Sequence, residues 1–248
     1  MKNTPNQIDI FWTGGLDSTF RLVQLLLQTD NPVQPHYIVR HEDSTGIEID
    51  TMIQLRRSLV RKYPEIRSRF LPTVYVNEDL IPKFKEIDEE IEELSRQGHV
   101  KEQYHIMSHY CKAFNIKQIE VALEGTGDID YDEKKFFFKN SDSFKCFTYP
   151  TLQLTKFEMF NQAKNEKWDD ILLMTSFCRR PSRKKIAPCG VCGPCVDAVS
   201  AGMGFRLPFK SRVKAYIQIP FRKFWRNNYA RHDKPFFKFI RNKFEGKF

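Results

Sequence analysis

Short apolar runs alternate with longer amphipathic stretches along most of this chain. Apolar runs of about four to eight residues between turn residues are typical of buried strands. Such runs predict strands at 8–12, 35–39, 73–77, 119–123 and 170–176. Strands that alternate with helices favour a parallel sheet with helices on both faces. The pattern therefore predicts an α/β fold with a doubly wound parallel five-stranded sheet.

Between the predicted strands, apolar residues recur at the spacing of one helix face. This spacing predicts helices at 18–28, 49–63 and 102–114. The segment 84–102 is charged, and we interpret it as a solvated helical insertion. A further helix is expected to begin at Thr155, because Thr155 and Glu158 have the spacing of a capping box.

The net charge of +9 is concentrated at one end of the 248-residue chain. Residues 205–248 contain 13 Lys and Arg against 2 Asp and Glu, out of 40 and 31 in the whole chain. The rest of the chain is therefore nearly neutral. We expect a body over 1–204 and a basic C-terminal extension over 205–248, and any polyanionic partner is expected to bind that extension.

The extension also contains aromatic residues at helical spacing on both sides of Pro235. This pattern favours a basic helical tail of two amphipathic helices, packed on the body or on a second copy of the chain in a homodimer. Three alternatives stay open. They are RNA bound by cations and stacking aromatics, an interfacial membrane helix, and a partner protein.

Membrane insertion and secretion are not expected from the sequence. Hydrophobic residues make up 41 % of the chain, but no apolar run is near the roughly 18 residues that a membrane span needs. The first residues lack the basic, apolar and small-residue pattern of a signal peptide. We therefore expect a cytoplasmic protein without a membrane span.

The stretch "IFWTGGLDSTF" (10–20) joins the first predicted strand to the first predicted helix. It places two glycines, an aspartate and two hydroxyl groups at a helix start, where N–H groups and partial positive charge favour anions. Its spacing differs from both G-x-x-x-x-G-K-[ST] and G-x-G-x-x-G. The alternative interpretation is an ordinary turn with a capping aspartate.

This loop resembles the S-G-G-x-D-S signature of the PP-loop ATP pyrophosphatases, with Thr13 in place of the leading serine. Members of that family cleave ATP between its α and β phosphates. The resemblance implies that the loop binds ATP together with Mg²⁺. The residues implied in nucleotide binding are Thr13, Gly14, Gly15, Leu16, Asp17, Ser18 and Thr19.

Four of the six cysteines lie in one short segment, at Cys178, Cys189, Cys192 and Cys195. Four thiolates match the closed tetrahedral coordination of a structural zinc ion, and C-x2-C pairs are typical of such sites. We therefore predict that these residues bind Zn²⁺. An iron–sulfur cluster also takes four cysteine ligands, and four unligated cysteines are the remaining alternative.

The two motifs together are similar to the 7-cyano-7-deazaguanine synthase family of queuosine biosynthesis. Two further segments resemble that family, "YPTLQLTKFEMF" (149–160) with its L-T-K-x-E element and "PCGVCGPC" (188–195) with its zinc block. The resemblance covers about 8–204 and implies an adenine nucleotide alpha hydrolase-like domain with a C-terminal zinc site. The segments 39–47 and 124–138 differ from the family pattern where its substrate pocket lies, so the substrate is left open.

The implied activity is that of an ATP-dependent ligase that forms a carbon–nitrogen bond. A 7-deazaguanine carboxylate would be adenylated and converted with ammonia to an amide or nitrile. The implied catalytic residues are Asp17, Ser18 and Lys156, although a solvated first-turn lysine is the alternative for Lys156.

Two other functions stay open. The first is a relative in antiviral defence or tRNA modification that acts on a macromolecule. The second is a non-enzymatic ATP-binding module whose tail recruits nucleic acid or a protein.

Overall fold

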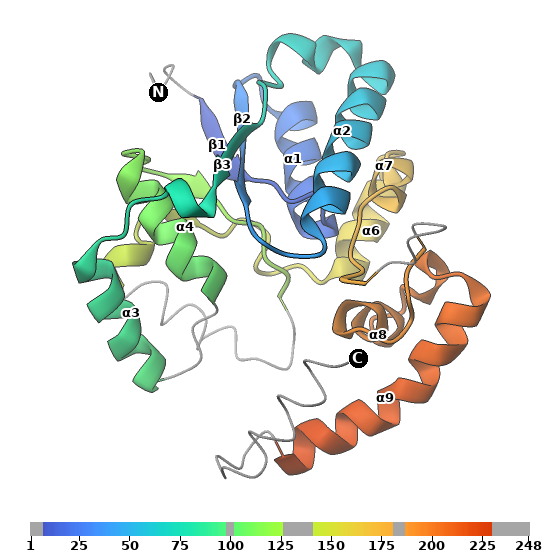
Figure 1. The fold of residues 1–248 in the computed structure, drawn as a ribbon. Helices are drawn as coiled ribbons and strands as arrows, with labels where there is room; N and C mark the ends of the chain where they lie inside the picture. The colour runs from blue at the N-terminus through green and yellow to red at the C-terminus, as the bar shows by residue number, and fades with distance from the viewer. Residues whose placement is uncertain (1–6, 98–101, 126–140, 181–186, 230–248) are drawn as a thin grey trace. The chain divides into compact units, whose positions relative to one another are not determined.

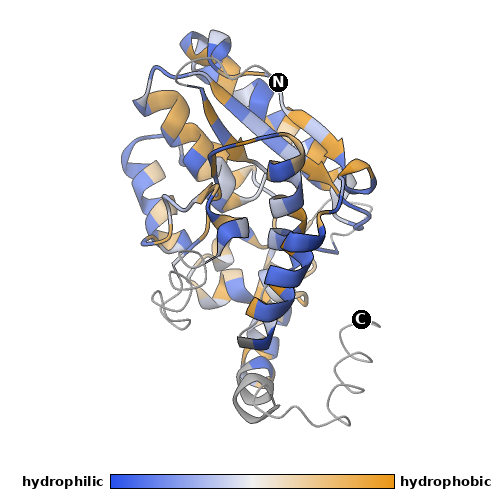
Figure 2. Ribbon diagram, turned by 90° about the vertical axis from the view of Figure 1, so that its left-hand side faces the viewer, coloured by the Kyte–Doolittle hydropathy of each residue, from blue (hydrophilic) through white to orange (hydrophobic). Residues whose placement is uncertain are grey.

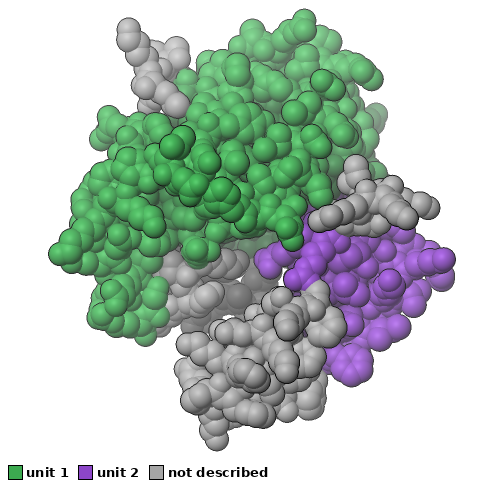
Figure 3. Space-filling model, viewed as in Figure 1, with its two compact units in different colours: residues 1–176 green, residues 177–248 purple. Residues whose placement is uncertain are grey.

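The computed structural model describes residues 7–97, 102–125, 141–180 and 187–229. The chain forms two compact units, residues 1–176 and residues 177–248 (Figure 3). All five strands lie in the first unit, and all four clustered cysteines lie in the second. Compactness alone does not show where a domain can fold independently, so the predicted domain boundary at 204 stays a prediction.

The first unit contains the predicted parallel five-stranded sheet (Figure 1). Its strands run in the order β3-β2-β1-β4-β5, and all four neighbouring pairs are parallel. The strands are β1 (Ile8–Phe11), β2 (Val33–Val39), β3 (Val74–Asn77), β4 (Ile119–Glu120) and β5 (Phe147–Thr148). The α/β fold class and the five-stranded sheet are thus confirmed, with β1 at the centre.

The fifth strand is not where the sequence predicted it. Residues 170–176 were expected to form a strand, but Asp169–Leu173 is the helix α7. Ile171 and Leu172 are buried while Leu173 and Met174 are exposed, which is a helical and not an alternating pattern. The true fifth strand, β5, has only two residues and therefore carries no periodic signal.

Helices cover both faces of this sheet (Figure 1). Helices α1, α2, α6 and α7 lie on one face, and α3 and α4 on the other. The helices not yet given bounds are α1 (Leu16–Gln28), α2 (Thr45–Lys62), α3 (Lys85–Gln97), α4 (Glu102–Ala113) and α6 (Lys156–Asn165), with 3-10 turns η1 (Pro64–Ser68), η2 (Glu78–Leu80) and η3 (Asp142–Phe144). The helices predicted at 18–28, 49–63 and 102–114 are confirmed to within a few residues at each end.

Helix α3 is more than the solvated insertion that its charge suggested. Ile87, Ile91 and Leu94 are buried in a core cluster that also includes Tyr104 of α4. The three residues have helical spacing, so one face of α3 is apolar and the rest is charged. Figure 2 looks onto this side of the molecule, and most of the α3 ribbon is coloured as hydrophilic there.

The second unit is helical in its described part. It contains α8 (Gly193–Ser200), η4 (Gly204–Arg206) and α9 (Phe209–Tyr229). Helix α9 confirms the helix expected before Pro235, while the segment after residue 229 lies outside the described residues. In the described part of the chain, every helix is too short or too polar to cross a membrane.

Candidate functional site

The glycine-containing loop directly follows the central strand of the sheet. Strand β1 ends at Phe11 and α1 begins at Leu16. Gly14 has a φ of +69°, and a Cβ on it would lie 3.2 Å from Cγ of Met52 and 3.3 Å from the carbonyl oxygen of Glu48. Both the backbone conformation and the packing against α2 therefore favour glycine at position 14.

Side chains of the predicted motif hold the loop closed. Ser18 Oγ accepts a hydrogen bond from the Thr13 N–H at 3.3 Å and lies 3.4 Å from Thr13 Oγ1. The hydroxyl of Thr19 is buried and accepts from the Trp12 indole N–H at 3.0 Å. The carbonyl of Gly14 accepts from the Ser176 N–H at 3.1 Å. The loop is thus preorganised by its own hydroxyl groups and by a residue far along the chain.

Lys156 lies beside this loop although it is distant in the sequence. Its Nζ is 3.2 Å from Asp17 Oδ2, in the first turn of α1, and 2.7 Å from Glu124 Oε1, shortly after β4. All three side chains are largely buried. Burial alone would lower the pKa of Lys156, but the charges of Asp17 and Glu124 outweigh it and raise that pKa. Lys156 is therefore held as a cation at the start of α1.

Local sequence fixes the position of Lys156. Thr155 caps α6: its Oγ1 accepts from the Glu158 N–H at 3.2 Å, and Glu158 Oε2 accepts from the Thr155 N–H at 2.8 Å. The capping box predicted from the sequence is thereby confirmed. Because α6 must begin after Thr155, Lys156 is its first residue and lies at the end that faces Asp17.

Glu124 was missed in the sequence analysis. Its signal was its place directly after the predicted strand 119–123. Next to it in the fold, Glu120 of β4 accepts two hydrogen bonds from Arg21 of α1, at 2.7 Å and 2.9 Å. This bidentate pair joins α1, which carries Asp17, to β4, which Glu124 follows shortly in the chain.

The four predicted cysteine ligands come together in the second unit. All four Sγ atoms of Cys178, Cys189, Cys192 and Cys195 lie within 4.8 Å of one another. Cys192 and Cys178 are 3.8 Å apart, and Cys189 and Cys195 are 4.0 Å apart. With Zn–S bonds of about 2.3 Å, a regular tetrahedron separates its sulfurs by about 3.8 Å. The cluster therefore has dimensions that could hold a zinc ion.

Backbone N–H groups point at these sulfurs. Cys178 Sγ accepts from the Cys189 N–H at 3.3 Å, and Cys189 Sγ accepts from the Val191 and Cys192 N–H groups at 3.4 Å. The contacts among the sulfurs themselves lower the pKa of Cys192 but raise the pKa values of Cys178 and Cys195, so it is the backbone donors that favour the thiolate form at these positions. Such donors stabilise thiolates, which are the form that binds metal.

A third cluster joins α3 to α4. Asp88 Oδ1 lies 2.5 Å from His105 Nε2 and 3.1 Å from His109 Nε2. The Nδ1 of His109 accepts from the Phe84 N–H at 3.0 Å, so in neutral His109 the proton is on Nε2, where it can be donated to Asp88. This ring orientation leaves Nε2 without a lone pair for a metal, and we interpret the cluster as a hydrogen-bonded link between helices.

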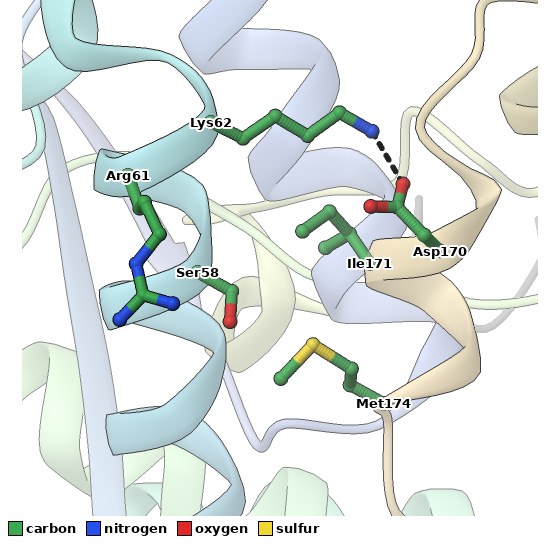
Figure 4. A pocket seen from close by; sticks show the side chains of 6 residues that line it. All are labelled: Ser58, Arg61, Lys62, Asp170, Ile171 and Met174. Carbon is green, nitrogen blue, oxygen red and sulfur yellow. Dashed lines mark hydrogen bonds and ion pairs between the residues drawn. The ribbon is translucent and has the colours of Figure 1, made fainter.

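A surface pocket of about 370 Å³ lies between α2 and α7 (Figure 4). Its side chains include the ion pair of Lys62 Nζ with Asp170 Oδ1 at 2.5 Å. The other lining residues are Ser58, Arg61, Ile171 and Met174. We call Asp17, Glu124 and Lys156 the loop cluster. Neither Asp17 nor Lys156 lines the pocket, so the pocket is separate from the loop cluster.

Comparisons of this sequence and fold with models of protein families, with curated proteins and with solved structures find no match. The chemistry of these clusters is therefore the basis on which a function can be assigned.

Proposed function

We propose that this protein is an ATP-dependent ligase that adenylates a carboxylate, of the kind found in the 7-cyano-7-deazaguanine synthase family. The observation that carries the proposal is the Lys156–Asp17–Glu124 cluster beside the glycine loop. The resemblance to the family placed residues 13–19 and Lys156 in two separate motifs. In the fold, Lys156 lies in contact with Asp17 of the first motif.

The position of this cluster in the sheet supports ligand binding. In doubly wound sheets, ligands bind outside the carboxyl ends of the strands where the strand order reverses. Here the chain runs outward from β1 to β2 and β3, then returns to β4 beside β1. Asp17 follows β1 and Glu124 follows β4, so the two carboxylates flank this switch point.

The chemistry of the cluster suits a polyphosphate. The start of α1 provides backbone N–H groups and a partial positive charge, and Lys156 adds a full positive charge. Asp17 and Glu124 provide carboxylate oxygens of the kind that Mg²⁺ prefers, and bound Mg²⁺ would offset phosphate charge. One lysine between two carboxylates leaves a local charge of −1, which a divalent cation would complement.

The proposed reaction needs positioning and charge stabilisation more than covalent help. A carboxylate oxygen of the substrate attacks the α-phosphorus of ATP, the bond to the β-phosphate oxygen breaks, and pyrophosphate leaves. Lys156 and the N–H groups of the loop stabilise the negative charge on the departing pyrophosphate. Ammonia then attacks the acyl carbon, loses a proton and displaces AMP, which gives the amide. A second adenylation of the amide oxygen and loss of AMP would give the nitrile.

A structural role for zinc is part of the proposal. Four cysteine ligands leave no open coordination position for a substrate or water. Sulfur atoms only 3.8–4.0 Å apart favour a single ion, since a multi-iron cluster would have to lie between its cysteines.

The test is a product assay with Mg-ATP, ammonium and 7-carboxy-7-deazaguanine, read by mass spectrometry. We expect AMP, pyrophosphate and the amide or nitrile from the wild type. Lys156→Ala should lower turnover by about 100-fold or more, because a charge aimed at the leaving group is lost. Lys164→Ala is the matched control, as Lys164 is an exposed lysine on the same helix.

Intact ATP and substrate in folded wild-type protein would overturn the choice of substrate. If ATP binding were also absent in calorimetry, the nucleotide site itself would be wrong.

A further inference from the structure

Helix α9 packs on its neighbours through small and polar residues. Ala215 is fully buried, and a Cβ on Gly190 would lie 2.1 Å from the carbonyl oxygen of Ser211. At the end of its described side chains, Arg222 donates to the Val191 carbonyl at 3.3 Å. Ser211, Ala215 and Arg222 have the spacing of one helix face. The contacts of this side of α9 are therefore made mainly by small and polar residues, with Gln218 and Ile219 half-buried beside them.

The opposite side of α9 is apolar and exposed. We call it the α9 face, and its residues are Phe209, Val213, Tyr216, Ile217 and Phe221. Phe209 is 75 % exposed, and Tyr216, Ile217 and Phe221 are 57–59 % exposed. An ordinary surface helix buries its apolar stripe and exposes its polar side, so α9 is inverted. A contiguous exposed apolar face of this kind marks an interaction site.

The charge around the α9 face restricts what can cover it. Lys210 and Lys214 are exposed between its apolar residues, and residues 209–229 contain no Asp or Glu. Residues 205–248 carry 13 basic against 2 acidic side chains. Two copies that met through this face would bring like charges together, which disfavours self-association.

A nucleic acid would satisfy the charge but not the apolar residues. Single-stranded RNA binds through cations and stacking aromatic rings, and aliphatic side chains such as Val213 and Ile217 offer no stacking surface. An anionic lipid surface satisfies both features, since acyl chains accept the apolar stripe and headgroups accept the lysines.

We propose that α9 is an interfacial helix that binds anionic lipid surfaces through the α9 face. The helix lies in the plane of the interface, with Phe209, Val213 and Ile217 among the acyl chains and Lys210 and Lys214 at the headgroups. The proposal is independent of the ligase activity, because it uses no residue of the loop cluster.

The test is co-sedimentation of the full chain with vesicles of phosphatidylcholine alone or mixed with phosphatidylglycerol. We expect binding to the mixed vesicles, and weaker binding at high salt because the lysines are screened. Phe209→Glu with Ile217→Glu should weaken partitioning by about tenfold or more, since two apolar side chains leave the lipid. Leu80→Glu is the matched control, because Leu80 is also 75 % exposed but lies in the first unit.

Several results would overturn the proposal. One is equal binding of wild type and the double variant to the mixed vesicles. Another is that the wild type does not bind vesicles at all. In that case, a dimer seen by light scattering and lost in the double variant would assign the α9 face to self-association. Binding of an oligouridine probe, measured by fluorescence anisotropy, would assign it to RNA. Circular dichroism and bound metal, measured on each variant, establish that the second unit is intact.

Discussion

The loop cluster of the first unit and the cysteine cluster of the second are built in opposite ways. The four cysteines lie between residues 178 and 195, whereas Asp17, Glu124 and Lys156 come from three distant parts of the chain. Four thiolates at this spacing would repel one another without a metal, whereas the loop cluster already pairs a cation with two anions. We therefore expect the second unit to depend on metal and the first on hydrogen bonds and burial.

The largest expected effect is the loss of a cysteine ligand. Cys192→Ser should abolish stoichiometric metal binding and unfold the described part of the second unit, since zinc binding contributes on the order of 10 kcal/mol in small structural sites. The measurement is metal content by mass spectrometry together with hydrogen exchange of residues 187–222. Cys146→Ala is the control, because Cys146 lies outside the cluster.

Retention of one metal per chain in Cys192→Ser would contradict a four-cysteine site. Loss of protection from hydrogen exchange in the first unit as well would show that the stability of the first unit also depends on the metal.

Gly190→Ala should have the next largest effect. Gly190 has a φ of +78°, and the added Cβ would lie 2.1 Å from the backbone oxygen of Ser211. Strain and clash together should cost about 2–4 kcal/mol of unfolding free energy. Gly46→Ala is the matched control in α2, where a Cβ meets nothing within 4 Å. Denaturant titration that gave equal stability for both variants would show that α9 does not pack tightly on this turn.

Gly14→Ala should have a smaller effect on stability than Gly190→Ala. Its φ is also positive, but the nearest atoms to the new Cβ are 3.2–3.4 Å away and include the flexible side chain of Met52. We expect a loss of about 1–2 kcal/mol from the left-handed conformation. A loss of unfolding free energy as large as that of Gly190→Ala would mean that the loop at Gly14 is packed as tightly as the turn at Gly190.

Sequence reasoning worked where the chemistry is local. The clustering of the four cysteines follows from their spacing, the capping box from Thr155 and Glu158, and the sheet from four clear apolar runs. It failed for β5, which is too short to show a period, and for α7, whose apolar residues imitate a strand. Glu124 follows a predicted strand, but its pairing with Lys156 is not visible in the sequence because a long segment separates the two residues. The inverted packing of α9 was equally hidden, since a helical period says nothing about which face is covered.

The smallest predicted effect concerns pH and Glu48, a carboxylate of α2. Burial raises the pKa of Glu48 above its ordinary value of 4.5, although the hydrogen bond from the Tyr37 hydroxyl, 2.8 Å from Glu48 Oε2, acts in the opposite direction. A raised pKa means that the folded state holds this proton more tightly than the unfolded state. Glu48 therefore makes stability fall as pH rises from 4.5 toward its folded pKa.

Glu48→Gln keeps an oxygen that can accept from Tyr37 but removes the titration. The free energy of unfolding of this variant, relative to that of the wild type, should increase between pH 4.5 and 7. Glu65→Gln removes an exposed carboxylate and is the control, for which no such increase is expected. The measurement is the free energy of unfolding by denaturant at several pH values. Parallel curves for Glu48→Gln and the wild type would contradict a pKa of Glu48 that burial raises. A steeper fall for the variant would mean that the Tyr37 hydrogen bond outweighs burial, so that the charged form of Glu48 stabilises the fold.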